Sequence, residues 1–146
     1  ELGHARHVAG RLEHGTVIHN FYVPAGGDVP DREKNVKFGQ KLDYLTDMRD
    51  WFKADRPERA VLVGDLSLAP REEVVVTRKD IPAWQLYSWW SYRSPNWDAA
   101  DKGRRLDHVW ATSDIAGAAH SSRIMRDARG WEKPSDHAPV FATFDL

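Results

Sequence analysis

Two stretches near the start of the chain have the apolar pattern of β-strands. Residues 5–12 and residues 16–23 are rich in apolar and β-branched side chains, and residues 13–15 between them are typical of a turn. Successive side chains of a strand point to opposite faces, so Asn20 and Tyr22 share one face of the second stretch. The pattern predicts two strands joined by a turn.

The pattern then changes to a helical period. Apolar positions recur every 3.6 residues or so between residues 33 and 53, with charged residues between them, which predicts an amphipathic helix. A short apolar run at residues 60–63 is bounded by Gly64 and Asp65, as expected of a buried strand that ends in a turn. Strand, helix and strand in this order predict an α/β layered architecture.

Further strands are predicted in the second half of the chain, where an aromatic-rich stretch runs from Trp84 to Trp97. These strands cover residues 72–76, 104–111, 123–125 and 140–144. We find no internal repeat, low-complexity tract or linker, so the simplest expectation is a single domain over residues 1–146.

Composition narrows the function classes. The 146 residues carry 21 basic and 22 acidic side chains, a net charge of −1, so contacts with nucleic acid must come from local patches. The absence of Cys excludes disulfides and thiolate metal sites and agrees with a cytoplasmic location. No apolar run is long enough to cross a bilayer. The chain begins with Glu1 rather than Met, and we expect a fragment or a processed piece.

Acidic residues stand next to predicted strands at three places. Asp65 follows the buried run, Asp107 begins a later strand, and Asp136 stands beside His137 in a loop before the last strand. Carboxylates at strand ends can bind cations or act as catalytic groups, and an Asp can fix the tautomer of a His. Each also has an ordinary structural interpretation: a turn, an ion pair with a neighbouring Arg, and a surface loop.

Together these acids and the histidine favour phosphodiester hydrolysis. Carboxylate oxygens suit Mg²⁺ or Mn²⁺, which neutralise charge on a phosphoryl group, and no Ser or Cys nucleophile is required. Trp89 and Trp90, interleaved with Arg residues, resemble a surface that stacks on bases and neutralises phosphates. The alternative is an aromatic core flanked by solvated Arg, and we expect a mixture of the two.

Five stretches, taken with their order and spacing, resemble one protein family. They are NFYVPAGG, AVLVGDLSLAP, YSWWSYR, GRRLDHVWATSDI and WEKPSDHAPVFATF. They resemble the C-terminal half of the exonuclease III family, the DNA-repair members of the endonuclease/exonuclease/phosphatase superfamily. The resemblance implies part of a four-layered α/β sandwich. It also implies a monomeric, divalent-metal-dependent nuclease that acts on double-stranded DNA at 3′ ends and abasic sites.

The resemblance assigns roles to individual residues. Tyr22 is similar to the tyrosine that contacts the scissile phosphate, Asp65 to the aspartate that positions the attacking water, and Asp107 to the acid that orients the catalytic histidine, here His137. Asp65, Asp136 and His137 are the implied ligands of Mg²⁺ or Mn²⁺. The implied DNA-binding residues are Asn20, Ser67, Trp89, Trp90, Arg105 and Leu106, of which the two Trp and Leu106 would receive a base-free sugar.

The chain departs from the family pattern in three respects. Ser67 stands at the place of an Asn, and its hydroxyl is shorter than an amide. The segment between Pro70 and Thr77 is shorter than in the family, and the N-terminal half of the family, with its metal-binding Glu, has no counterpart. Three alternatives stay open: a DNA nuclease, a non-catalytic remnant that binds DNA or a partner protein, and a relative that acts on a phosphorylated small molecule or lipid.

Overall fold

A mixed four-stranded sheet lies at the centre of the fold. The computed structural model describes residues 5–68 and 87–146. In the sheet, β1 (His7–Arg11), β2 (Val17–Phe21), β3 (Ala60–Asp65) and β6 (Asp107–Ala111) lie in the order β1-β2-β3-β6. β2 and β3 run parallel, and the other two pairs are antiparallel. The parallel pair needs a long crossover, which the helix between β2 and β3 supplies.

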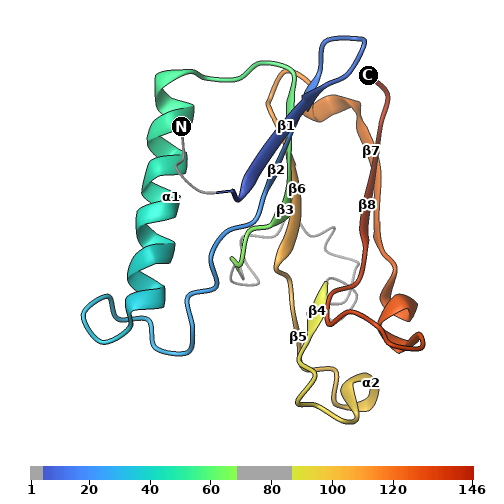
Figure 1. The fold of residues 1–146 in the computed structure, drawn as a ribbon. Coiled ribbons are helices and arrows are strands. Elements are labelled where there is room, and N and C mark those ends of the chain that lie inside the picture. Colours follow the sequence, from blue (N-terminus) through green and yellow to red (C-terminus); the bar gives the residue numbers. More distant parts are fainter. Residues whose placement is uncertain (1–4, 69–86) are drawn as a thin grey trace.

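Helix α1 (Val36–Ala54) packs on one face of this sheet (Figure 1). The hydrophobic core between them consists of the buried residues Phe21, Val23, Tyr44, Met48 and Leu66. The helix begins three residues later than the sequence pattern predicted. Asn35 caps it, because its side-chain oxygen accepts hydrogen bonds from the amides of Lys37 and Phe38.

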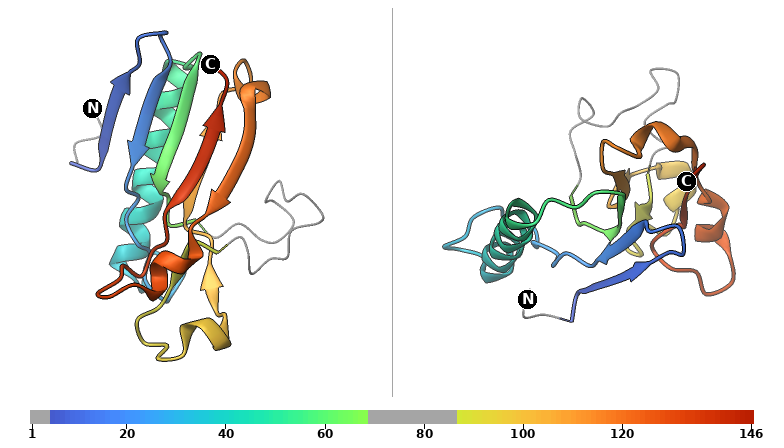
Figure 2. Two further views of the ribbon diagram at one scale, coloured as in Figure 1. Left: turned by 90° about the vertical axis from the view of Figure 1, so that its right-hand side faces the viewer. Right: turned by 90° about the horizontal axis from the view of Figure 1, so that it is seen from above.

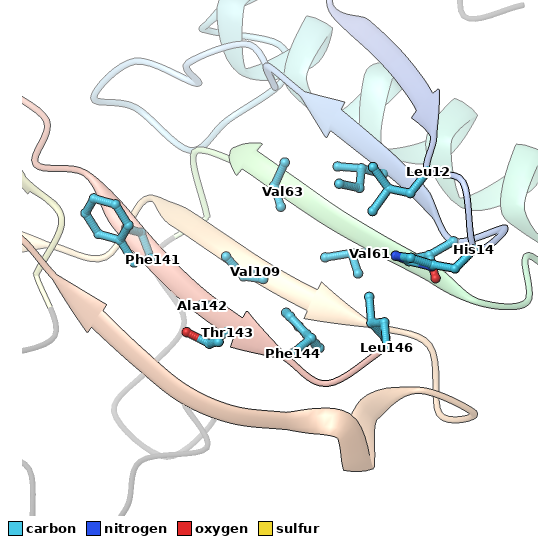
Figure 3. Close-up of a pocket in the computed structure, with 13 residues that line it drawn as sticks. Leu12, His14, Val61, Val63, Val109, Phe141, Ala142, Thr143, Phe144 and Leu146 are labelled. Carbon is cyan, nitrogen blue, oxygen red and sulfur yellow. The ribbon is translucent and has the colours of Figure 1, made fainter.

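The antiparallel pair of β7 (Ala119–Ile124) and β8 (Val140–Phe144) lies on the opposite side of the sheet from α1, as Figures 1 and 2 show. A cavity of about 590 Å³ separates this pair from the four-stranded sheet. Its walls are mainly apolar, with Val61, Val63 and Val109 on the sheet facing Phe144 on β8 (Figure 3). Helix, sheet and strand pair thus form successive layers, in agreement with the predicted α/β sandwich.

Short elements close one end of the layers. β4 (Trp89–Trp90) pairs with β5 (Gly103–Arg104), and α2 (Trp97–Ala100) lies between them in the sequence. The remaining elements are the 3₁₀ helices η2 (Ala116–Ala118) and η3 (Arg126–Gly130). Trp90 is 1% exposed and packs edge-on against Trp97. This end is therefore built around tryptophan rings.

Most predicted strands are confirmed with shifted ends. The stretch at residues 104–111, predicted as one strand, divides into β5 and β6, so that Asp107 still begins a strand. The strand predicted at residues 123–125 is the end of the longer β7, and residues 140–144 are correct as predicted. The strand predicted at residues 72–76 lies outside the described residues. None of the helices in the described ranges is long and apolar enough for a membrane span.

A pair of histidines joins the edge strand β1 to β2 beneath α1. His7 Nε2 lies 3.1 Å from His19 Nδ1, and both rings meet the edge of Trp51. One ring must donate and the other accept, so the contact suits two neutral imidazoles. Burial lowers the pKa of His7, and burial together with the neighbouring His7 lowers the pKa of His19.

We expect this pair to destabilise the protein in acid. Because the folded pKa values lie below that of a free imidazole, the stabilising contribution is present above about pH 6.5 and is lost as the pH falls through the folded values. Urea unfolding at pH 7.5 and pH 5 measures the loss. His7→Gln, which keeps a donor for His19, should reduce the pH dependence. Equal pH dependence in His7→Gln and the wild type would contradict the prediction.

Candidate active site

Two carboxylates meet at one end of the central sheet. Asp65 is the last residue of β3 and Asp107 the first of β6, and the antiparallel register places them directly opposite each other. Their side chains are mostly buried, with 19% and 21% exposed. Like charges directly opposite in a sheet are destabilising unless a cation lies nearby.

His137 lies against both carboxylates. Its Nδ1 lies 2.8 Å from Asp107 Oδ2, and its Nε2 lies 4.0 Å from Asp65 Oδ2. The hydrogen bond to Asp107 raises the pKa of His137, burial opposes the rise, and the charges of Asp107, Asp65 and Asp136 add to it. Since a carboxylate only accepts, Nδ1 carries a proton in this contact, and the Nε2 edge faces Asp65.

The loop that carries His137 is held by backbone contacts with β4. Trp89 and His137 form an isolated antiparallel bridge, and the amide of Trp90 donates to the carbonyl of Asp136 over 2.9 Å. The carboxylate of Asp136 contacts the ring of Trp89. Its Oδ2 accepts a 2.9 Å hydrogen bond from the indole Nε1 of Trp89.

The turn after β3 fixes the carboxylate of Asp65. Asp65 Oδ1 accepts hydrogen bonds from the amide of Ser67 at 2.8 Å and from its hydroxyl at 3.2 Å. Ser67 has a φ of 49°, in the left-handed region that Asn and Gly enter more readily than Ser. The Nζ of Lys41 on α1 donates to the carbonyl of Ser67, and burial lowers the pKa of Lys41 while Asp65 opposes that shift.

Tyr22 and Asn20 lie at the same end of the sheet. The amide of Val23, the next residue, donates to the carbonyl of Asp65 over 2.8 Å, which places Tyr22 beside the acid pair. Tyr22 is 55% exposed, and the guanidinium of Arg6 lies 4.8 Å from its ring centroid. Asn20 is exposed and pairs with Val63, close to Gly64. Their predicted contacts with a phosphate stay predictions.

The remaining predicted DNA-binding residues differ in exposure. Trp89 is half-buried, and Arg104 lies over its ring at 5.8 Å. Trp90 is 1% exposed and its indole donates to Asp101, and its contact with DNA stays a prediction. Arg105 is half-buried, and its Nε donates to the carbonyl of Asp107 over 2.6 Å. Leu106 is half-buried. Its carbonyl accepts from the amide of Leu66, and its amide donates to the hydroxyl of Ser88.

The predicted metal ligands do not form a metal site in this arrangement. In residues 5–68 and 87–146, no three His, Asp or Glu side chains are grouped so that they could hold an ion. Asp65 and His137 are close, but Asp136 turns to Trp89. The grouping of Asp65, Asp136 and His137 as a ligand set stays a prediction, as does Mg²⁺ or Mn²⁺ as the cofactor.

Two residues that help to hold the segments around the acids carry no signal in the sequence. Lys41 is a charged residue on an amphipathic helix and has the appearance of a solvated lysine. Ser88 lies in an aromatic stretch, yet it is fully buried and its hydroxyl accepts from the amides of Leu106 and Asp107. Only the fold brings them to Asp65 and Asp107.

The cavity between the sheets is separate from this site. Its lining residues come from the β1–β2 turn, the inner face of the central sheet and β8, and none of the predicted site residues is among them. His137 lies in the loop that precedes β8, and its side chain does not line the cavity.

Comparisons with known proteins agree with this architecture. An AP endonuclease from Archaeoglobus fulgidus matches with a TM-score of 0.81 at 24% identity. A 3′ phosphatase from Neisseria bound to a product DNA hairpin gives 0.75 at 23%, and a 3′-5′ exonuclease from Neisseria meningitidis gives 0.77 at 22%. Each match covers 97% of this chain and 65% of the other. These TM-scores show that the chains share a fold.

Sequence comparison leads to the family. Exodeoxyribonuclease III of Haemophilus influenzae is 41% identical over 58 residues, which are 40% of this chain and 21% of that protein. The chain thus aligns with about a fifth of this curated relative. Residues 6–137, which include Asp65, Asp107, Asp136 and His137, match the Endonuclease/Exonuclease/phosphatase family. This match spans most of the 146 residues, and the chain belongs to that family.

Proposed function

We propose that the end of the sheet with Asp65, Asp107 and His137 hydrolyses phosphodiester bonds in DNA. The observation that carries the proposal is that three segments meet: the imidazole of His137, in the loop before β8, contacts Asp65 at the end of β3 and Asp107 at the start of β6. The named relatives, an exodeoxyribonuclease III, an AP endonuclease and a 3′-5′ exonuclease, support DNA as the substrate. The proposed reactions are 3′-5′ exonuclease cleavage and incision at abasic sites, carried out by a monomer in the cytoplasm.

Each residue has a distinct part in the proposed reaction. Asp107 holds the Nδ1 proton of His137, so that the Nε2 edge of a positively charged ring offsets charge on the phosphoryl oxygens. Asp65, fixed through its Oδ1 by Ser67, keeps Oδ2 available to accept a proton from the attacking water. The water oxygen bonds to phosphorus as the bond to the leaving oxygen breaks. Tyr22 and Asn20 are placed to hydrogen-bond the phosphate.

The substrate surface is proposed to lie beside this imidazole. Trp89 offers an aromatic face with Arg104 above it, which suits a base or sugar and its phosphate. Arg105 and Leu106 are assigned to the same proposed surface, although the Nε of Arg105 donates to the carbonyl of Asp107. Trp90 is left out of this surface because it is buried.

A cleavage assay tests the proposal. The purified protein is incubated with three labelled DNAs: a duplex with a recessed 3′ end, a duplex with one abasic site, and a single strand. Parallel reactions contain Mg²⁺, Mn²⁺ or a chelator, since nucleases of this family are in general metal-dependent. We expect shortening from the 3′ end and incision of the abasic duplex in the metal reactions.

Two outcomes would replace the proposal. Salt-dependent binding of duplex DNA without cleavage under any metal condition would identify a non-catalytic DNA-binding protein. Release of phosphate from phosphorylated small molecules, with DNA left intact, would identify a phosphatase-like relative.

A further inference from the structure

Residues 88–90, which we call the bridging segment, contact every acid and histidine of the site except Asp65. The segment lies between β6 and the loop at residues 135–138. Ser88 is fully buried, and Trp89 is half-buried. Nothing in the proposed chemistry requires either residue to touch the reacting atoms, so their contacts call for a separate explanation.

Ser88 contacts both sides of the Asp107–His137 hydrogen bond. Its hydroxyl oxygen accepts from the amides of Leu106 at 3.1 Å and Asp107 at 3.0 Å. Its own carbonyl accepts from the amide of Ala138 over 2.8 Å, and its amide donates to the carbonyl of Arg104 over 3.0 Å. Ser88 is thus bonded to Asp107 itself on one side and to the residue after His137 on the other.

Trp89 holds the third charged residue. Its indole Nε1 donates to Asp136 Oδ2 over 2.9 Å, and its backbone bridges to His137. The next amide, of Trp90, donates to the carbonyl of Asp136. A Phe at this position would keep the aromatic face but could not donate to Asp136.

We propose that Ser88 and Trp89 are positioning residues, which set the geometry of Asp107, Asp136 and His137. Ser88 fixes the start of β6, from which the carboxylate of Asp107 reaches Nδ1 of His137. Trp89 fixes the orientation of Asp136 through its indole N–H. This role is separate from the proposed contact of its ring with DNA. The kinetic part of this inference rests on the proposed nuclease function, whereas the structural part does not.

Substitution of Ser88 gives the main test. Ser88→Ala leaves the amides of Leu106 and Asp107 without their acceptor, and Ser88→Thr keeps it. We expect Ser88→Ala to lower kcat about 10- to 100-fold with little change in KM, because misplacement of a catalytic group acts on the transition state. Ser88→Thr should recover most of the rate. Trp89→Phe should lower kcat while the KM for DNA stays near that of the wild type.

Thr112 provides the matched control. Its hydroxyl accepts from the amide of Ala60 over 3.0 Å, at the other end of β3 and β6 from Asp65 and Asp107. Thr112→Val therefore removes the same kind of acceptor far from the site, and its kcat should be unchanged. A fall in kcat for Thr112→Val equal to that of Ser88→Ala would show a general loss of stability and overturn the inference. Unchanged kcat in both Ser88→Ala and Trp89→Phe would also overturn it.

NMR spectroscopy separates this inference from the nuclease proposal. In Ser88→Ala the amides of Leu106 and Asp107 should exchange faster with solvent, and the Nδ1 proton resonance of His137 should weaken. Thr112→Val should instead speed exchange at Ala60. If the wild type cuts no DNA, the nuclease proposal fails, and these spectra alone decide whether Ser88 positions Asp107 and His137. Unchanged exchange at Asp107 and an unchanged His137 resonance in Ser88→Ala would then end the positioning role.

Discussion

Replacing His137 with Asn should reduce the rate of DNA cleavage by about 10²–10⁴-fold, the range expected for loss of a positioned proton-transfer group. The side chain contacts both acids, with Nδ1 at 2.8 Å from Asp107 and Nε2 at 4.0 Å from Asp65. Asn has neither the length nor the charge to replace these contacts. Asp107→Asn should also lower the rate, because a neutral amide holds the imidazolium less strongly.

A second acid–histidine pair of the same chain serves as the control. His120 Nδ1 lies 3.5 Å from Asp145 Oδ2, and both side chains are more than half exposed. Asp145 follows β8, whereas His137 precedes it, so this pair lies at the opposite end of the strand. His120→Asn and Asp145→Asn should leave cleavage within about twofold of the wild type, as expected for an exposed ion pair.

Single-turnover rates on the abasic duplex measure the effect, and circular dichroism checks that each variant is folded. Should His137→Asn fail to fold, Asp107→Asn tests the same contact with a side chain of nearly equal size. A rate within threefold of the wild type in both His137→Asn and Asp107→Asn would exclude the pair from the chemistry.

The sequence predicted the elements that bring these residues together. Asp65 after a buried strand, Asp107 at the start of another and Asp136-His137 before a third are local features, and the strands form as expected. The register that places Asp65 opposite Asp107 is a property of the pairing of β3 with β6, which local pattern does not determine. The convergence therefore followed from the family resemblance and is seen directly only in the structure.

Contacts between distant segments account for what the sequence did not predict. The stretch at residues 104–111 divides because the amide of Leu66 and the hydroxyl of Ser88 bind the backbone of Leu106, which takes it out of the ladder. Adjacent tryptophans in an aromatic run give no indication of which one is buried, and Trp90 fills the interior while Trp89 reaches Asp136.

Gly64→Ala should lower the free energy of unfolding by more than about 3 kcal/mol, a large effect for one methyl group. Gly64 has a φ of 124°, a backbone conformation that residues with a side chain rarely adopt. A Cβ there would lie 2.1 Å from the carbonyl oxygen of Phe21. That oxygen belongs to the backbone of β2, so it cannot turn aside. Relief requires that β2 and β3 separate at the point where Asp65 leaves the sheet.

Two other glycines separate the two causes of this loss of stability, the strained φ and the close approach of β2. Gly15 has a φ of 91° but nothing within 4 Å of its Cβ position, so Gly15→Ala measures the backbone strain alone, about 1–3 kcal/mol. Gly10 has neither feature, and Gly10→Ala should change stability by less than about 0.5 kcal/mol. Urea midpoints of the three variants give the comparison. Because the excess of Gly64→Ala over Gly15→Ala measures the close approach of β2 to β3, equal losses in the two variants would show that Gly64 matters only for its dihedral angle. A clear excess would mean that the glycine before Asp65 is needed so that β2 can lie against the end of β3, where the acid pair forms.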